Sequence, residues 1–132
     1  MARRLILDTS TLIAYERGRF DTSAFDDDDL AIAAVTVAEL RTGIELADTP
    51  QRAADRARVL AAITAAVAVL DYTEGTAAEH ARLLAHVRRA GVARGAHDLI
   101  IAAHAAEDGR TVLSLDAKAR FADLPGVPAL TP

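Results

Sequence analysis

Short, almost continuously apolar segments alternate along this chain with longer segments whose apolar residues are spaced as in helices. Val, Ile and Leu dominate the short segments. An unbroken apolar run is typical of a strand that is covered on both faces, as in a parallel sheet. The predicted strands cover residues 5–7, 30–35, 66–70, 111–115 and 127–130.

Helices are predicted between these strands from the residues that mark helix ends. Gly91 and Gly109 each follow an alanine-rich helical pattern, as glycine often does at a helix C-terminus. Thr49 before Pro50 is typical of an N-cap followed by the first helical position. These signals predict helices at about 37–46, from Thr49 onward, at 76–90 and at 97–108. Strands that alternate with helices indicate an α/β fold with a mostly parallel central sheet flanked by helices. No repeat or linker divides residues 1–132, so we expect one domain.

The composition excludes several classes of protein. The chain has 132 residues, 52% of them hydrophobic and 26% charged, which suits one buried core and not a disordered chain. It has no cysteine, which excludes a disulfide framework, a thiolate zinc site and a thiol nucleophile. The longest nearly apolar stretch, 57–70, is too short to span a membrane, and Asp8 interrupts the N-terminal apolar run too early for a signal peptide. We therefore expect a cytoplasmic protein without membrane contact. The net charge of −4 also lacks the basic footprint of a protein held on nucleic acid by bulk electrostatics.

Acidic residues follow the predicted strands or open the next helix. In α/β folds, chemistry collects beyond the carboxyl ends of the strands. Carboxylate oxygens are the ligands that Mg²⁺ prefers, and one or two such ions can activate water for displacement at a phosphodiester. The acids in these places are Asp8, Glu39, Asp98 and Asp116.

Each of these acids also has an ordinary structural interpretation. Asp8 and Asp116 stand where helix caps are common. Glu39 completes a capping-box pattern with Thr36, and Asp98 in a first helical turn suits the helix dipole. Spacing alone leaves both interpretations open.

Four segments of the chain resemble the motifs of the PIN-domain ribonucleases. They are LDTSTLIA at 7–14, VAELRTG at 37–43, HDLIIAAHA at 97–105, and VLSLD at 112–116 with Phe121 downstream. The chain is most similar to the VapC-type toxins of bacterial toxin–antitoxin pairs. This resemblance implies a compact α/β/α domain with Mg²⁺- or Mn²⁺-dependent endoribonuclease activity. It places the metal site at Asp8, Glu39, Asp98 and Asp116, with Ser10 as a small polar residue that orients a carboxylate or water.

The resemblance also implies partners. We expect an RNA substrate, a cognate antitoxin protein that inhibits the toxin, and a homodimer. By analogy with the family, the antitoxin should place a basic side chain near the carboxylates. Its helical parts are expected in an apolar groove beside the helices between residues 37 and 69. Arg88, Arg89 and Arg94 flank the loop before Asp98 and could contact RNA phosphates, although arginine near a helix C-terminus is favourable without a ligand.

Two alternatives remain open at this point. A haloacid-dehalogenase-like phosphotransfer domain also places an Asp after a strand, but it requires a second Asp two positions later, where Ser10 stands. A non-catalytic α/β binding module would keep the fold and its caps. Dependence of RNA cleavage on a divalent metal separates that module from the nuclease.

Overall fold

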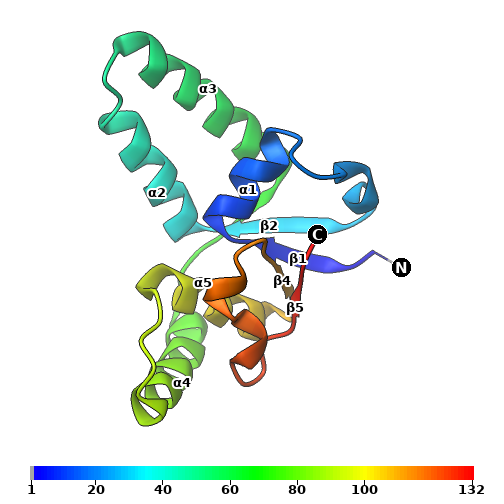
Figure 1. Ribbon diagram of the computed structural model, residues 1–132, viewed down its shortest axis with the longest axis vertical. Coiled ribbons are helices and arrows are strands. Elements are labelled where there is room, and N and C mark those ends of the chain that lie inside the picture. The colour runs from blue at the N-terminus through cyan, green and yellow to red at the C-terminus, as the bar shows by residue number, and fades with distance from the viewer. Residues whose placement is uncertain (1) are drawn as a thin grey trace.

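The computed structural model describes residues 2–132, which form a five-stranded sheet flanked by helices (Figure 1). The strands are β1 (Arg4–Leu7), β2 (Asp29–Ala33), β3 (Ala68–Leu70), β4 (Thr111–Leu113) and β5 (Ala129–Leu130). The helices are α1 (Thr9–Glu16), α2 (Ala34–Glu45), α3 (Pro50–Ala66), α4 (Glu74–Ala90) and α5 (Ala96–Asp108). Short 3₁₀ turns cover Thr22–Phe25, Ala117–Ala119 and Phe121–Asp123.

All neighbouring strands are parallel, in the order β3-β2-β1-β4-β5, which confirms the predicted α/β fold class. Strands β2 and β3 lie on one side of β1, and β4 and β5, which come later in the chain, lie on the other side. The order therefore reverses between β1 and β4. Ligands of open α/β sheets bind outside the carboxyl ends of the strands at such a switch point.

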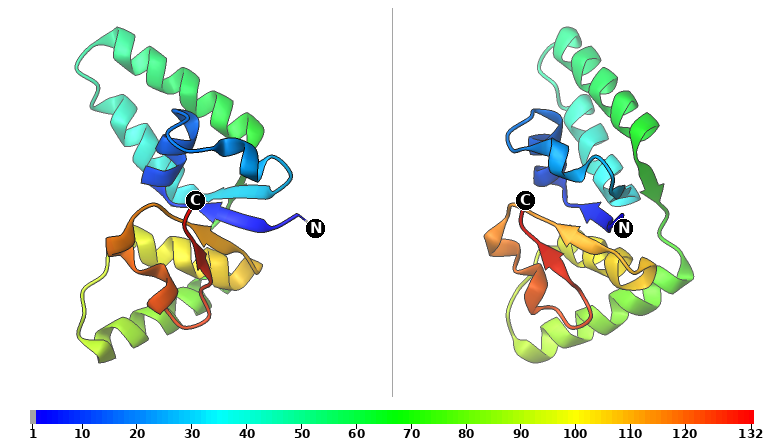
Figure 2. Two further views of the ribbon diagram at one scale, coloured as in Figure 1. Left: turned by 45° about the vertical axis from the view of Figure 1, so that its right-hand side comes forward. Right: turned by 90° about the vertical axis from the view of Figure 1, so that its right-hand side faces the viewer.

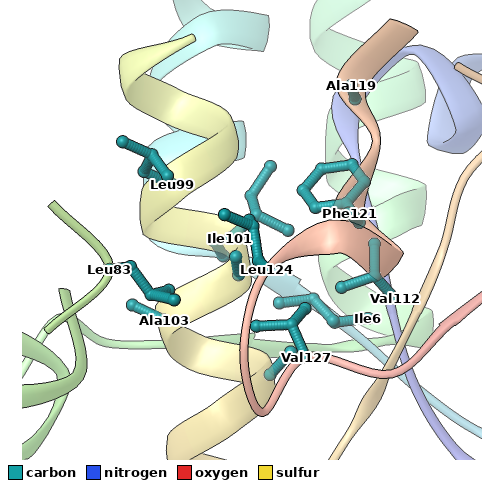
Figure 3. Close-up of a cluster of buried hydrophobic side chains, with 13 residues drawn as sticks. Ile6, Leu83, Leu99, Ile101, Ala103, Val112, Ala119, Phe121, Leu124 and Val127 are labelled. Carbon is teal, nitrogen blue, oxygen red and sulfur yellow. The ribbon is translucent and has the colours of Figure 1, made fainter. Parts of the chain in front are cut away.

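Helices cover both faces of the sheet. Figures 1 and 2 show α1 and the α2–α3 hairpin on one side, and α4 and α5 on the other. Leu5 and Leu7 of β1 pack in the core on the α1 and α3 side, whereas Ile6 between them packs in the core against α5. Figure 3 shows this second core, where Ile6 and Val112 lie with Phe121 and side chains of α5. Burial on both faces explains why the strands are continuously apolar.

The predicted helix ends are confirmed at three places. Thr49 caps α3 by accepting a hydrogen bond from the Arg52 amide, and Pro50 is the first helical residue. Gly91 and Gly109 follow α4 and α5 in the left-handed conformation, with φ of 71° and 62°. Glycine adopts this conformation without the steric cost that a Cβ atom brings.

The boundary between β2 and α2 was predicted wrongly. The strand ends at Ala33 and the helix begins at Ala34, so Val35 and Thr36 are helical. Both are β-branched and favour strands intrinsically, but their packing in the first turn of α2 overrides that preference. The N-cap is Ala33, without a side-chain cap, so Thr36 and Glu39 form no capping box.

Strands β3, β4 and β5 are shorter than the predicted strands at 66–70, 111–115 and 127–130. Helix α3 continues to Ala66, so β3 begins two residues later than the predicted start at residue 66. Strand β4 ends at Leu113, and the residues that follow turn away to form the candidate site. Across residues 2–132, no helix combines the length and the apolarity needed to cross a membrane.

Candidate active site

The four predicted acids are carried by neighbouring elements at the carboxyl edge of the sheet. Asp8 follows β1, Asp116 lies three residues after β4, Glu39 is on α2, which follows β2, and Asp98 is in the first turn of α5. The pKa of Asp98 is raised, first by burial and then by the negative charges of Asp8, Asp116 and Glu39. The charge of His97 opposes this shift. The other three acids are therefore close enough to Asp98 to disfavour its charged form.

Asp8 is buried and has donors on both carboxylate oxygens. It is 3% exposed, and its Oδ1 accepts a hydrogen bond of 3.1 Å from the Thr11 amide, so it caps α1. Its Oδ2 accepts a bond of 2.7 Å from the Ser114 hydroxyl. The cap interpretation of Asp8 is thus confirmed, but capping occupies only one of its oxygens.

Ser114 connects the two strands at the switch point. Besides donating to Asp8, its Oγ accepts a bond of 3.0 Å from the Asp116 amide. Nearby, Thr11 Oγ1 accepts a bond of 2.9 Å from the Leu115 amide. Since Ser114 and Thr11 are both buried, these bonds fix the segment that leaves β4 against the start of α1.

Glu39 is held from two directions. Thr9 Oγ1 donates a bond of 2.8 Å to Glu39 Oε1, and His97 Nδ1 lies 3.2 Å from the same oxygen. Both contacts bridge different elements, since Thr9 begins α1 and His97 is the second residue of α5. Glu39 therefore points across the sheet edge toward other acids, instead of back toward the start of its own helix.

Asp116 and Asp98 differ in how their charge is compensated. Asp116 Oδ1 accepts a bond of 2.9 Å from the Lys118 amide and caps the Ala117–Ala119 turn, as its structural interpretation predicted. Within the part of the chain that the structure describes, the Asp98 carboxylate accepts no hydrogen bond from a protein donor. A Cβ atom at Gly95 would lie 3.1 Å from Asp98 Oδ2, so the glycine leaves room for this carboxylate.

Ser10 stands apart from the hydroxyl groups that contact the acids. It is exposed on α1, and within residues 2–132 its side chain has no hydrogen-bond partner. The hydroxyls that bind the acids belong to Thr9 and Ser114. Sequence reasoning gave Thr9 no role. The position of Thr9 directly after Asp8 was the only indication of this role. Consecutive residues of a helix point in different directions, so Thr9 and Ser10 face different sides of α1.

The three arginines that flank the loop before Asp98 differ in their contacts. Arg88 and Arg89 are exposed in the last turn of α4, where positive charge suits the helix dipole. Arg94 instead donates from Nη1 to the carbonyl oxygens of Ala119 and Arg120, at 2.6 and 2.8 Å.

The donor set at this edge consists of oxygen atoms, which suits hard cations such as Mg²⁺ and Mn²⁺. As the side chains stand, no three Asp, Glu, His or Cys residues of the described chain (2–132) are grouped closely enough to enclose a metal ion directly. Mg²⁺ usually keeps several waters and takes one or two carboxylates directly, so a spread set of acids fits a hydrated ion. Burial and then three neighbouring negative charges raise the pKa of Asp98, and a bound cation would favour the charged form of this carboxyl group.

An apolar groove of about 560 Å³ opens beside Glu39 and Thr9. It lies between α1, α2 and α3, and its apolar lining includes Ile13, Leu40 and Leu60. Charged side chains of both signs also line it: Glu16, Arg17, Asp55 and Arg56. The groove lies in the segment where sequence reasoning expected a partner helix.

Comparison with known proteins identifies the family. The PIN domain family model matches residues 5–127. The chain belongs to the PIN-domain family. Ribonuclease VapC5 of Mycobacterium tuberculosis is 37% identical over 111 residues, which cover 84% of this chain and 82% of that protein. This relative assigns the chain to the VapC-type members and leaves the haloacid-dehalogenase alternative without support.

Solved structures agree with this assignment. The crystal structure of VapBC-5, a member of the VapBC family of toxin–antitoxin systems from Mycobacterium tuberculosis, matches with a TM-score of 0.77 and 32% identity, over 97% of this chain and 96% of that chain. VapBC2 from Rickettsia felis, bound to a DNA fragment from its promoter, matches with a TM-score of 0.82, over 98% of both chains. At 18% identity, this second likeness shows the fold alone.

Proposed function

We propose that this VapC-type PIN domain is the endoribonuclease toxin of a toxin–antitoxin pair and hydrolyses RNA phosphodiester bonds with the help of Mg²⁺ or Mn²⁺. The observation that carries the proposal is the acid group at the switch point, where burial and three neighbouring carboxylates raise the pKa of Asp98. A relative of 37% identity that is named a ribonuclease supports RNA as the substrate. Since RNA substrates lie in the cytoplasm, we place the reaction there.

Asp8, Glu39, Asp98 and Asp116 would hold the metal, directly or through water. A bound Mg²⁺ or Mn²⁺ supplies a Lewis acid for the phosphate and lowers the pKa of a bound water. Oxygen-only ligation and the open, partly exposed edge of the sheet suit this chemistry.

The protein's own residues orient these carboxylates. Ser114 donates to Asp8, while Thr9 and His97 contact Glu39, so these two carboxylates are oriented before substrate binds. Preorganised charge of this kind is the largest contribution to many enzymatic reactions. Ser10 is exposed on α1 and would orient a carboxylate or water, as the family resemblance implies.

The antitoxin would occupy the apolar groove between α1, α2 and α3. The groove presents an apolar lining with charges of both signs, which fits an amphipathic helix. Glu39 is one of the residues that line it, so a basic side chain from the partner can reach this acid and form a charge-assisted bond. A homodimer is expected for the toxin, and sedimentation of the purified chain measures it.

RNA cleavage by highly purified protein, with and without Mg²⁺, tests the proposed activity. We expect cleavage that requires Mg²⁺ or Mn²⁺ and stops with chelator. An Asp98→Asn variant purified in the same way controls for contaminating nucleases. Undiminished cleavage in excess EDTA would overturn the metal mechanism, and absence of cleavage with metal would favour the non-catalytic module.

Co-expression with the adjacent small gene tests the partner. We expect the product of that gene to co-purify with this chain and to relieve growth arrest. Failure of both would contradict the toxin–antitoxin assignment.

A further inference from the structure

Arg94 links the two loops that carry Asp98 and Asp116. It lies in the connection between α4 and α5, four residues before Asp98. Its Nη1 donates to the carbonyl oxygens of Ala119 and Arg120, which follow Asp116 in the chain. An Nη1 group carries two hydrogen atoms, so these two bonds use its full donor capacity.

The residue that accepts the second bond has an unusual backbone. Arg120 has a φ of 51°, and across residues 2–132 it is the only residue other than glycine with a positive φ. Side chains of L residues rarely adopt this region, because the Cβ atom approaches the following carbonyl. The left-handed Arg120 ends the Ala117–Ala119 turn that Asp116 caps, so it sets the path of the segment after Asp116.

Asp116 is therefore held at both ends of its turn. Ser114 Oγ binds its amide on the side of β4, and Arg94 binds the carbonyls on the far side of the turn. Asp116 is also the exposed acid of the group, so packing alone does not fix it.

We propose that Arg94 is a positioning residue for Asp116: its guanidinium keeps Arg120 left-handed and so holds the Asp116 turn against the start of α5. The inference rests on the proposed nuclease function for its effect on cleavage. It assigns the Nη1 donors of this arginine to backbone carbonyls, whereas the sequence suggested a contact with RNA phosphates.

The test compares Arg94→Met with the double variant Arg94→Met/Arg120→Gly. Glycine adopts a positive φ freely, so it should keep the turn in place without the guanidinium. We expect Arg94→Met to lower kcat about 10- to 100-fold, since a displacement of about 1 Å at an active site can cost on the order of 100-fold. The KM for RNA should change by less than about twofold, because phosphate contacts, which set affinity, are kept. Arg120→Gly should restore most of the loss in kcat.

Amide hydrogen exchange of residues 117–121 in chelated protein supplies a readout that does not depend on cleavage. Exchange should be faster in Arg94→Met, return toward the wild-type rate in the double variant, and be intermediate in Arg94→Lys, whose ammonium keeps donors on a shorter side chain. Arg52→Met, which removes the same charge at the distant start of α3, should change neither exchange nor kcat.

Two results would overturn the proposal. The first is an Arg94→Met variant whose KM for RNA is raised while its amide exchange is unchanged. If the dependence of its RNA affinity on salt also falls by about one unit of slope, Arg94 contacts a phosphate. The second is failure of Arg120→Gly to restore both exchange and kcat. If the wild-type protein cleaves no RNA, the proposed function fails, and the exchange rates still decide whether Arg94 holds the turn.

Discussion

The Ser114 hydroxyl donates a hydrogen bond of 2.7 Å to Asp8 Oδ2 and thereby joins the ends of β4 and β1. Both residues are buried, so water does not compete strongly for this bond. The same hydroxyl accepts from the Asp116 amide. One serine thus fixes a carboxylate from one strand end and the backbone of a second acid from the neighbouring strand end.

Replacing Ser114 with Ala should impair both folding and cleavage. The change leaves Asp8 Oδ2 and the Asp116 amide without their partner, and a lost hydrogen bond to a charged group costs about 1.5–3 kcal/mol. We expect the free energy of unfolding to fall by about 2 kcal/mol in the presence of chelator. Cleavage should fall by at least about tenfold, as for other misplaced catalytic groups. Urea unfolding and a cleavage assay measure the two effects.

Ser114→Thr is the matched control, because it keeps the hydroxyl and adds one methyl group. It should retain most cleavage, even if the extra methyl lowers stability by about 1 kcal/mol. Equal activity of the Ala and Thr variants would show that the hydroxyl does not orient the acids.

Asp98→Asn should separate stability from activity. Burial and three neighbouring carboxylates raise the pKa of Asp98, so its charge destabilises the metal-free fold above that pKa, and the cost vanishes below the unfolded value of 3.8. The amide removes this charge at nearly constant shape. We expect a higher Tm in EDTA, a smaller Mg²⁺-induced rise in Tm, and a loss of cleavage of about 100-fold or more.

Asp48→Asn is a suitable comparison for Asp98→Asn, because this aspartate forms an exposed ion pair with Arg52 just before α3, away from the acid group. It should leave both cleavage and the response to Mg²⁺ unchanged. A wild-type level of cleavage in Asp98→Asn would contradict the role of the four acids.

The fold could be predicted because local and global signals agree. Apolar runs covered on both faces gave the strands, and Gly91 and Gly109 marked helix ends through a conformation that glycine adopts most easily. The start of α2 was missed since Val35 and Thr36 favour strands intrinsically. Only the packing of the first helical turn, which involves residues distant in sequence, reveals that they are helical.

The acids of the site could be found from the sequence, but their supporting contacts could not. Asp8 follows a strand, and Glu39 lies in the helix after the next strand. In a parallel sheet, both positions lie at the carboxyl edge of the sheet. Thr9 donates to Glu39 across 30 positions of the chain, and His97 contacts the same carboxylate across 58 positions. Such pairings depend on the direction of side chains at the start of a helix. A hydroxyl one position further along the helix, at Ser10 instead of Thr9, points in another direction.

Gly43→Met should block the groove without unfolding the protein. Gly43 lines the groove within α2, and the nearest atom to an added Cβ is Arg56 Nη1 at 4.0 Å, so a side chain fits the free chain. Replacing glycine inside a helix should even stabilise it by about 0.5–1 kcal/mol. We expect binding of the antitoxin to weaken by at least about tenfold, since the filled groove no longer accepts a partner helix.

Gly43→Ala controls for the backbone effect, because it gains helix stability with little change in groove volume. It should bind the antitoxin as the wild type does, and both variants should keep cleaving RNA. Unchanged affinity of Gly43→Met, measured by titration of labelled antitoxin, would place the partner elsewhere.

His104 should make the fold less stable as the pH falls below about 6.5. Its side chain is 1% exposed beside the Tyr72 ring, and its Nε2 is a buried atom without a hydrogen-bond partner. Burial lowers its pKa below the ordinary value of 6.5, against the opposing charges of Glu107, Asp108 and Asp71. The unfolded chain therefore takes up a proton that the folded chain excludes.

Within that window, the free energy of unfolding should fall by up to about 1.4 kcal/mol for each unit of decreasing pH. His104→Leu removes the titrating group and keeps an apolar side chain at the buried position. The unfolding free energy of the wild type minus that of the variant should therefore decrease as the pH falls from 7.5 to 5, because only the wild type carries this titrating group. Urea midpoints across this range measure the difference, and a difference that stays constant with pH would show that His104 is protonated equally in the folded and unfolded chains.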